Sequence, residues 1–502
     1  MNNKMFLYEV DPLFFYDFDN DGYGDFKGFI KKIDYFNFLN VDAILFPDIF
    51  NQEQTILKNA QVTIYDKYGN INDLKLLAKT LKKYKISLFV EIDIKNILNS
   101  MIIKTSIEDL KSNDISKYIE RDNSYVFSKS LNWGTEKRID AFKKIINFWS
   151  KIGVSNFVFS NFEHLYENNS KLDSKLLKQL KFFYALAKDL NEESTIGIRS
   201  IYFNNSTINN IFKKYIGAIC DFYIDSSYSL IATDKNYPFD IQKKFNHKII
   251  LKKIKKIKID SQYFSKYFIS LNNNKIGRIN SRWLNEENLI DESNKCLLMF
   301  VNLLPYSSVN YFGDELGQLR LKLKNKDDYH DYEYVERKRL LESKKYKTKE
   351  YELSQKYLSR INTQSFFMWN DKLNGGFSKA KTIFRKLPIN YLSHNLKDEY
   401  SNINSIVNFY KNLIKISKSI SDESVKINTK IKIKLRKKIF IIKITSNDDN
   451  KIIAINLSNK AIDKKINSKW KVALSSISTK EYRGKVDCLS PYEALVLIKI
   501  NK

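Results

Sequence analysis

The stretch Gly153–Leu165, GVSNFVFSNFEHL, indicates the class of fold. In the segment before it, apolar residues 142, 145, 146 and 149 follow the spacing of one helical face, which predicts a helix packed against a core. Gly153 ends that helix, and Val154–Phe159 then reads as a short buried strand. A helix that leads into a buried strand is one unit of a parallel α/β fold. Catalytic groups of such folds lie where the strand meets its following loop, and here that position holds Ser160.

Short buried segments of this kind recur along the chain, with helical segments between them. Eight such units within about 300 residues predict a (β/α)8 TIM barrel, and a doubly wound sheet is the alternative. The expected strands are Met5–Val10, Ala43–Phe46, Ile86–Ile94, Asn156–Phe159, Thr195–Ile198, Asp221–Ile224, Phe268–Leu271 and Val309–Phe312.

From Val425 onward the pattern changes to strict alternation, as in KINTKIKIKL and KIFIIKI. Alternation predicts a separate antiparallel β domain with one face in water. Its lysines are expected on the solvent side of the strands. No exposed aromatic residues are interleaved with them to stack on nucleic-acid bases.

The chain carries 85 Lys and Arg against 57 Asp and Glu, a formal net charge of +28. Such a charge favours nucleic acid or an anionic membrane as a partner. However, the lysines are spread over every helix and over the C-terminal strands, with no arginine-rich arm or zinc motif. We therefore interpret the charge as a bias in composition and do not expect nucleic acid as a partner.

Cys220, Cys296 and Cys488 lie far apart and show no CxxC spacing, as expected for reduced thiols. The first residues, MNNKMFLYEVDP, lack the apolar core of a signal peptide. No run reaches the roughly 18 apolar residues that a membrane span needs. We expect a soluble, cytoplasmic protein without a membrane partner.

The segment 17–28, DFDNDGYGDFKG, is the most specific local motif. Carboxylates at Asp17, Asp19, Asp21 and Asp25, with the carbonyl of Tyr23, occupy positions 1, 3, 5, 9 and 7 of a calcium loop. Position 12 holds glycine rather than the bidentate glutamate of an EF-hand, so a helix–loop–helix sensor is excluded. A solvated acidic turn is the alternative. We expect structural Ca²⁺ here, with Mg²⁺ as the other candidate.

Several stretches together resemble the α-amylase family of glycoside hydrolases (family 13), specifically its oligo-1,6-glucosidase-like members. The similar stretches are FFYDFDNDGYGDFKGFIKKIDYFNFLNVDAILF near the start, FWSKIGVSNF, SLNNNKIGRINSRW, YFGDELGQ, MWNDKLNGGFS and the closing SPYEALVLIKI. The resemblance covers nearly the whole chain and does not depend on one motif.

The resemblance implies a (β/α)8 barrel, a subdomain inserted after the third strand and a C-terminal antiparallel β-sandwich. On this basis residues 1–96 and 131–420 form the barrel, residues 97–130 a shortened insert and residues 421–502 the C-terminal domain. A short insert removes part of one wall of the sugar pocket.

The family cleaves α-glucosidic bonds with an Asp nucleophile, a Glu general acid and a second Asp that stabilises the transition state. By the resemblance these positions hold Ser160, Ile198 and Lys275 in this chain. None of the three is a carboxylic acid, so no catalytic residue of the family is retained.

The resemblance also places five residues in the substrate pocket. Val158 takes the place of the arginine two residues before the nucleophile, and Asn96 takes that of the histidine after the third strand. Asn274 replaces the usual histidine beside Lys275, while Asn273 and Arg278 match the family.

These substitutions remove the chemistry of retaining hydrolysis. That reaction needs two carboxyl groups about 5–5.5 Å apart, and loss of the general acid alone costs about 10²–10⁴ in rate. A serine without a base is a poor nucleophile. A lysine about 4 Å from a forming oxocarbenium ion opposes it by about 4 kcal/mol at an effective dielectric constant near 20.

We therefore expect an α-glucosidase-like pseudoenzyme that binds an α-glucoside, an oligosaccharide or a protein partner without hydrolysis. One alternative is an active α-glucosidase that uses relocated carboxylates, for which Glu163, Glu192, Glu193, Asp314 and Glu315 are candidates. The other is a basic scaffold that binds nucleic acid or an acidic partner. The family's inactive transporter heavy chains carry a membrane helix, which this chain lacks.

Overall fold

The computed structural model describes most of the chain. The described residues are 4–49, 57–58, 61–62, 64–94, 136–162, 172–323, 328, 332–343, 348–424, 430–436, 438–445, 450–466, 469–477 and 486–500. The expected insert, residues 97–130, lies outside them, so its extent stays a prediction.

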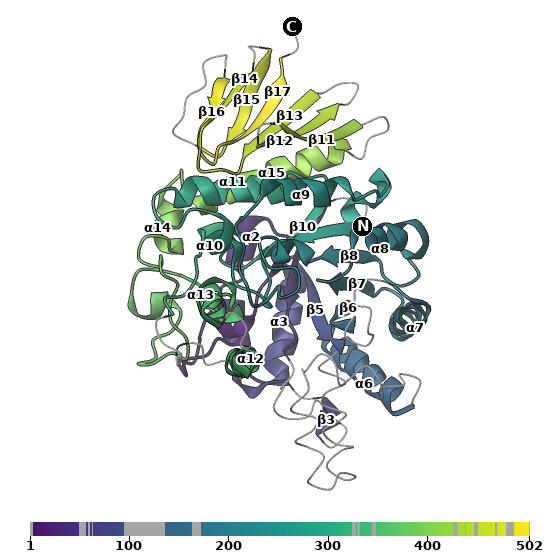
Figure 1. Cartoon of the computed structure of the whole chain (residues 1–502). Coiled ribbons are helices and arrows are strands. Elements are labelled where there is room, and N and C mark those ends of the chain that lie inside the picture. The colour runs from purple at the N-terminus through teal and green to yellow at the C-terminus, as the bar shows by residue number, and fades with distance from the viewer. Residues whose placement is uncertain are drawn as a thin grey trace.

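Eight parallel strands close into a barrel in the order β1-β10-β9-β8-β7-β6-β5-β2 (Figure 1). All eight coincide with the strands expected from the sequence, apart from one or two residues at their ends, and the predicted TIM barrel is confirmed. The strands are β1 Phe6–Glu9, β2 Ala43–Phe46, β5 Ser87–Asp93, β6 Asn156–Ser160, β7 Thr195–Ser200, β8 Phe222–Asp225, β9 Tyr267–Ser270 and β10 Ser307–Tyr311.

Side chains alternate between the inside and the outside of the barrel, because successive residues of a strand face opposite ways. Inward-facing apolar residues from seven strands, such as Leu45, Phe89 and Phe222, form one closed cluster inside the barrel. Their outward-facing neighbours, such as Ile44, Val90 and Tyr223, belong to the larger core between the strands and the surrounding helices. The barrel interior is thus a packed apolar layer, and polar groups lie only toward the strand ends.

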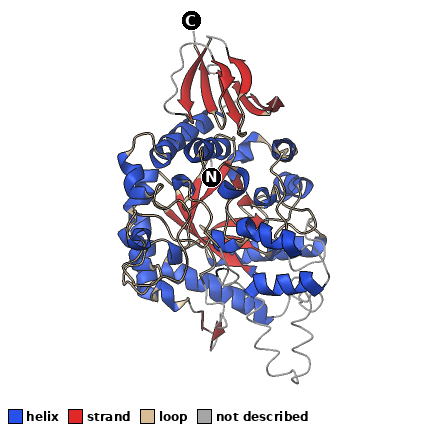
Figure 2. Ribbon diagram, turned by 60° about the vertical axis from the view of Figure 1, so that its left-hand side comes forward, coloured by secondary structure: helices blue, strands red, loops and turns tan. Residues whose placement is uncertain are grey.

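Helices surround the barrel (Figure 2). Local sequence signals explain several of their ends: Asn70 and Asp73 form a capping box at the start of α3, and Gly153, at φ +93°, follows α6. The described helices are α1 Phe26–Lys31, α2 Asp34–Leu39, α3 Ile71–Lys83, α6 Glu136–Ile152, α7 Ser174–Leu190, α8 Asn205–Asn210, α9 His247–Lys255, α10 Ile279–Trp283, α11 Ile290–Asn302, α12 Tyr332–Ser343, α13 Thr348–Leu358, α14 Leu396–Ser401 and α15 Ile406–Ser424.

The C-terminal region forms antiparallel sheets, as the alternation predicted. A five-stranded sheet has the order β11-β12-β13-β17-β15, and β14 pairs with β16. One face of the larger sheet packs on α11 and α15 of the barrel, and its other face packs on the β14–β16 pair. The strands are β11 Lys430–Arg436, β12 Ile439–Thr445, β13 Asn450–Asn456, β14 Ile462–Ile466, β15 Trp470–Ser475, β16 Val486–Leu489 and β17 Ala494–Lys499.

Two further features complete the fold. A small hairpin of β3 Leu57–Lys58 and β4 Gln61–Val62 follows β2. The last barrel helix, α15, continues to Ser424, so the expected domain boundary at residue 421 falls within its final turn. Among the described helices, none combines the length and the apolar character needed to cross a membrane.

Candidate functional site at the barrel mouth

A layer of polar side chains lies above the apolar interior, at the C-terminal ends of the strands. It contains Glu9 at the end of β1, Glu91 on β5, Ser160 at the end of β6, Arg199 on β7 and Ser270 at the end of β9. All five are buried, with Glu9 at 0% and Glu91 at 2% exposure. In this fold the mouth is where catalytic groups are placed, and we call this layer the mouth network.

Arg199 lies at the centre of the mouth network. Its Nη2 donates to Glu9 Oε2 at 2.7 Å, and its Nη1 donates to Glu91 Oε2 at 2.8 Å. Its Nε donates to the hydroxyl of Ser226 at 2.9 Å, and its Nη2 also donates to the hydroxyl of Ser270 at 3.3 Å. Two buried carboxylates, from the strands β1 and β5 on either side of β2, thus share one guanidinium from β7 across the barrel. Pairing of this kind makes a group of buried ions tolerable.

Ionisation in the mouth network follows from burial and these pairings. Burial favours the neutral form of Glu91, but the charges of Arg199 and Lys275 outweigh it and lower the Glu91 pKa. At Glu9 burial prevails over the attraction of Arg199, and the pKa is raised. The two carboxylates hold the guanidinium in its charged form, because they raise the Arg199 pKa against the effect of burial.

Both expected residues of β6 point into the barrel, and Ser160 alone of the two belongs to the mouth network. Val158 is part of the apolar layer inside the barrel. Ser160 lies beyond it, and its hydroxyl donates to Glu91 Oε1 at 2.6 Å. The Ser160 hydroxyl is therefore bonded to a carboxylate that Arg199 already neutralises, and no histidine contacts it among the described residues.

Residue 198 requires a correction. The side chain of Ile198 points out of the barrel and packs in the core between the strands and the helices. Because neighbouring residues of a strand face opposite ways, the next residue, Arg199, points into the mouth. The β7 side chain that takes part in the site is thus a cation rather than an isoleucine.

The loop after β9 supplies a second cation. Lys275 Nζ lies 3.4 Å from Asp93 Oδ2, and Asn161 Nδ2 also donates to this oxygen, at 2.5 Å. Burial disfavours the charged form of Lys275, but the carboxylates of Asp93 and Glu91 outweigh it and raise the lysine pKa. Lys275 therefore stays protonated and neutralises the last carboxylate of β5.

Three residues of the same loop carry buried polar atoms that lack a partner among the described groups. These atoms are Asn273 Nδ2, Asn274 Oδ1, and Nε and Nη2 of Arg278. The Arg278 guanidinium lies 5.2 Å from the centroid of the Tyr311 ring, and its Nη1 lies 3.4 Å from Asp314 Oδ1. A buried donor or acceptor without a partner costs about 1–3 kcal/mol, so these atoms favour a bound hydroxyl group or water.

Other expected site residues fall elsewhere. Asn96 and Glu163 lie outside the described residues. Asp314 bonds to Asn272 and Arg278, with its pKa raised to about 7 mainly by burial. Glu315 accepts hydrogen bonds from two tyrosine hydroxyls in the outer core, and Glu192 and Glu193 are exposed in the turn after α7. None of these described acids belongs to the mouth network.

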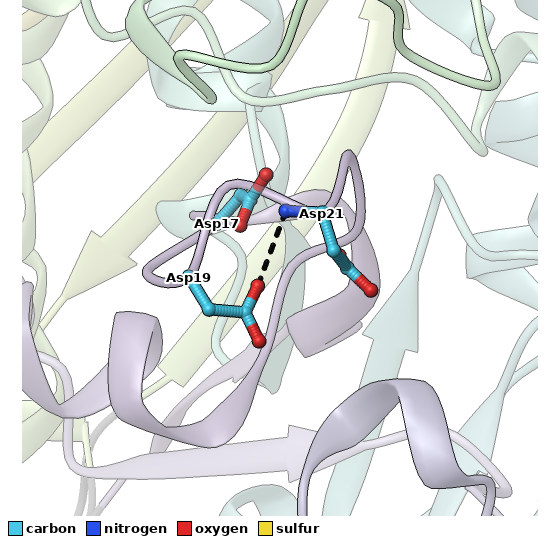
Figure 3. A group of neighbouring side chains, drawn as sticks. All are labelled: Asp17, Asp19 and Asp21. Carbon is cyan, nitrogen blue, oxygen red and sulfur yellow. Dashed lines mark hydrogen bonds between the residues drawn. The ribbon is translucent and has the colours of Figure 1, made fainter.

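The acidic loop brings three of its expected ligands together. Asp17, Asp19 and Asp21 each offer a carboxylate oxygen, and the three oxygens lie within 4.8 Å of one another (Figure 3). Asp17 already accepts bonds from two backbone amides and from Ser378, and burial raises its pKa. Asp21 also pairs with Lys67 at 2.9 Å. The donor set suits a hard divalent cation, with the Lys67 ammonium as a competitor.

The other two expected ligands have different surroundings. Asp25 caps α1 with Oδ1 on the Gly28 amide, and its Oδ2 accepts from the Phe18 amide, so neither oxygen joins the group. The ring of Tyr23 stacks on Phe384 at 4.4 Å, and its amide donates to Asp21. The structure therefore brings three of the four expected carboxylates together, and a role for the Tyr23 carbonyl stays a prediction.

Comparison with known families settles the relationship. The family model described as "Alpha amylase, catalytic domain" matches residues 9–106 and 111–424. The chain belongs to the α-amylase family. This match spans every strand of the barrel but the first part of β1, so the resemblance inferred from the sequence motifs is confirmed.

Curated members of the α-amylase family match over most of their length. The glucan 1,6-alpha-glucosidase of Streptococcus pneumoniae serotype 4 is 22% identical over 540 residues, which cover 97% of this chain and 97% of that protein. The oligo-1,6-glucosidase of Parageobacillus thermoglucosidasius is 22% identical and covers 82% of each chain. The chain is thus α-glucosidase-like within the α-amylase family.

Solved structures of the family share the fold. An isomaltulose synthase from Klebsiella sp. LX3 superposes with a TM-score of 0.80 at 19% identity, over 99% of this chain and 98% of the other. A trehalose-6-phosphate hydrolase of Bacillus licheniformis gives 0.79 at 19% identity, over 99% of both chains. At this identity the likeness establishes the α-amylase fold of this chain and does not extend to its activity.

Sequence reasoning missed Glu9, Glu91 and Arg199. Each is an ionisable residue within a strand that otherwise reads as buried, as in FLYEV, FVEID and TIGIRS. Buried charges need partners of the opposite sign. Two acids and one arginine in such strands were therefore a signal for an internal ion network. Which strands place them face to face is decided only by closure of the barrel.

Proposed function

We propose that this α-amylase-family protein is an α-glucosidase-like pseudoenzyme, which binds an α-glucoside at the barrel mouth without hydrolysing it. The observation that carries the proposal is the guanidinium of Arg199, bonded at 2.7 and 2.8 Å to both carboxylates of the mouth network. The guanidinium of Arg199 lies between Glu9 and Glu91. For these acids to act in hydrolysis, the reacting carbon of a substrate would have to reach that same position.

Chemistry at the other positions supports the same conclusion. A retaining mechanism needs one free carboxylate to attack and one protonated carboxyl to donate. Glu91 is held ionised by two cations, and its second oxygen accepts from Ser160. Asp93 is paired with Lys275. Neither acid on β5 is free to attack a glycosidic carbon.

Hydrolysis is the direct test. Purified protein is assayed with p-nitrophenyl α-glucoside and with isomaltose, and we expect no release above the buffer rate. Turnover that falls at least a hundredfold in Glu91→Gln or Asp93→Asn would overturn the proposal and favour relocated carboxylates. Turnover that is equal in these variants and in the exposed-site control Glu192→Gln identifies a contaminating enzyme.

One observation favours the alternative, an active α-glucosidase that uses relocated carboxylates. Burial raises the pKa of Asp11, just beyond β1, to about 6, while the Glu91 pKa is lowered. Opposite shifts fit an acid and nucleophile pair only where the two carboxyl groups also lie about 5–5.5 Å apart. Loss of activity in both Asp11→Asn and Glu91→Gln, with a bell-shaped pH profile, would assign these roles.

The proposed ligand is an α-glucoside because the loop after β9 holds buried hydrogen-bonding atoms of both kinds that lack a partner among the described groups. Asn273 Nδ2 and two Arg278 nitrogens donate, and Asn274 Oδ1 accepts. A sugar ring with several hydroxyl groups satisfies both. In calorimetry with millimolar isomaltose, maltose and sucrose we expect binding that Asn273→Ala weakens and Asn236→Ala, on an exposed turn, does not.

Absence of heat and of any melting-temperature shift with all three sugars would rule out this ligand class. The pseudoenzyme would then bind a protein partner, rather than a sugar, at the barrel mouth. This is tested by whether binding of that partner is lost in Lys275→Glu.

We also propose that Asp17, Asp19 and Asp21 hold Ca²⁺, with Mg²⁺ as the weaker ligand. The ion would have a structural role only: it would stabilise the loop between β1 and α1, in which Asp17 already accepts a hydrogen bond from Ser378. Calorimetry is expected to show one site that Asp19→Asn removes and Asp371→Asn, an exposed control, retains. Lys67→Met is expected to tighten binding, because it removes the ammonium that pairs with Asp21. Equal heats in wild type and Asp19→Asn would contradict this site.

A further inference from the structure

Two lysine-rich elements, far apart in sequence, lie side by side on the surface where the barrel meets the C-terminal domain. Helix α9 contacts strand β11, as Figure 1 shows at the upper right of the barrel. The contact is reinforced by His247 of α9, whose Nε2 bonds to the carbonyl of Leu457. The cations of β11 lie on the side of the sheet that carries Ile439, away from the barrel helices, so they and the lysines of α9 flank this edge strand from two sides. We call the exposed surface of α9, β11 and β12 the basic face.

Cations crowd the basic face, and acids are absent from the segments that form it. Residues 243–259 and 425–447 contain no Asp or Glu. No described carboxylate is within ion-pair distance of its exposed cations. These exposed cations are Lys248, Lys252, Lys255, Lys256 and Lys258 from α9 and the residues after it, and Lys430, Lys432, Lys434, Arg436, Lys438 and Lys443 from β11 and β12.

Like charges even lie directly opposite each other. In the antiparallel pair of β11 and β12, Lys432 is the register partner of Lys443, and both are exposed. Two ammonium groups at such positions destabilise the sheet, since cross-strand neighbours stand about 4.5–5.5 Å apart at Cβ. An external anion removes this repulsion.

The sequence alone does not lead us to expect nucleic acid as a partner, but the fold gathers these cations, and we propose that the basic face binds the phosphate backbone of double-stranded nucleic acid, without sequence preference. Alternate residues of β11 repeat at about 6.8 Å, which places its cations in a row along the strand, and a DNA duplex presents one negative charge for about every 1.7 Å of its axis. This binding lies outside the barrel mouth and does not depend on the proposed sugar site.

The structure favours a duplex over the two other polyanions. A membrane surface takes up an apolar helix face. In α9 the apolar residues Ile250, Leu251 and Ile254 are buried against the barrel, and Ile249 alone of the apolar residues of this helix is exposed. Single strands are held by aromatic stacking, and the described exposed residues of α9, β11 and β12 include no aromatic side chain.

One competing explanation concerns β11 alone. It is an edge strand, and lysines on edge strands prevent pairing with another chain. That role does not account for the five cations of α9 and the residues after it, which are not on an edge. The two explanations predict different consequences of removing the charges.

The test measures binding of a fluorescent 25-base-pair DNA duplex by the full chain, by anisotropy, between 50 and 200 mM NaCl. The variant carries Lys248→Gln, Lys252→Gln and Lys255→Gln. The control carries Lys75→Gln, Lys79→Gln and Lys82→Gln on α3, which are exposed at the same i, i+4, i+7 spacing and lower the net charge equally. We expect the α9 variant to lose at least tenfold in affinity at 100 mM salt, and its salt slope to fall by about 0.9 per lysine.

Each other outcome overturns the proposal. Equal losses in both triple variants assign binding to the overall charge of +28. Binding to phosphatidylserine vesicles but not to the duplex identifies a membrane surface. If Lys430→Gln, Lys432→Gln and Lys434→Gln together cause self-association and leave duplex affinity unchanged, the β11 lysines only protect the edge. No binding of duplex at 50 mM salt excludes the site.

Discussion

At the scale of single residues, Arg199 determines the character of the barrel mouth. A guanidinium between two buried carboxylates is balanced only while all three charges are present, because each ion alone pays a desolvation cost of several kcal/mol. The site is therefore sensitive to removal of any one member.

Arg199→Ala is predicted to lower the free energy of unfolding by about 3–5 kcal/mol, since it leaves Glu9 and Glu91 buried without a cation. Chemical denaturation measures the loss. The control removes all three charges, as Glu9→Gln, Glu91→Gln and Arg199→Met, and is expected to be more stable than Arg199→Ala. If Arg199→Ala lowers the free energy of unfolding by less than about 1 kcal/mol, the two carboxylates do not depend on Arg199 for their stability in the core.

Asp11 predicts a pH dependence of stability. Burial raises its pKa to about 6 in the folded protein, above about 3.9 for an unfolded chain. The folded state therefore binds the extra proton between pH 6 and pH 4, and this residue's contribution to stability rises as the pH falls through that window. The difference is at most about 3 kcal/mol.

The measurement compares wild type with Asp11→Asn, which keeps the acceptor for the Leu13 amide and the Tyr68 hydroxyl but does not titrate. The variant is expected to gain relative stability as the pH is raised from 4 to 7. Parallel stability curves for the two proteins would contradict the assignment.

At the scale of elements, the loop after β9 depends on one close backbone contact. Gly277 donates its amide to the carbonyl of Leu358, and a Cβ at this position would lie 1.8 Å from the carbonyl oxygen of Tyr357. The contact joins the loop that carries Asn273, Asn274 and Arg278 to the end of α13.

Gly277→Ala is predicted to destabilise the protein by clearly more than Gly153→Ala and to weaken binding at the barrel mouth. Gly153 has φ +93° but open space around its Cβ position, so alanine there costs only backbone strain, about 1 kcal/mol. Thermal denaturation of both variants, with calorimetry of any bound sugar, checks the difference. Equal losses of stability in Gly277→Ala and Gly153→Ala would mean that the loop after β9 can shift to accommodate the added methyl group at little cost.

Many of the strands and helices could be predicted from the sequence. All eight barrel strands follow from short apolar runs, since a strand buried on both faces needs no polar residue in its middle. The break between α1 and α2 does not follow from the sequence pattern: the structure divides residues 26–39 into two helices, with the turn at Lys32 and Ile33. Its apolar residues keep a helical spacing across the break, so the pattern does not reveal it.

At the scale of the whole molecule, the barrel and the C-terminal sheet share one apolar core. Ile442 of β12 faces the barrel helices, and Ile439 of the same strand faces the β14–β16 pair. Phe300 of α11 and Phe440 of β12 have ring centroids 5.2 Å apart across this contact.

Ile442→Ala and Ile439→Ala remove the same atoms from two sides of one strand, each at 1% exposure. Both are predicted to cost about 2–5 kcal/mol. Calorimetry is expected to show a lower melting temperature of the barrel only in Ile442→Ala, since that change opens the shared core. A barrel transition unaffected by Ile442→Ala would mean that the two parts unfold independently.

The sequence by itself determined the barrel, the alternating strands of the C-terminal domain and the family, because these depend on periodic burial and on local motifs. From the resemblance it also predicted that Ser160 and Lys275 stand where the family has acids, and this stays a prediction. The tertiary structure alone decided that Arg199 rather than Ile198 enters the mouth and that Glu9 meets Glu91 there. The physical reason is that inward or outward facing, and contact between strands that are far apart in sequence, are fixed only when the sheet closes on itself.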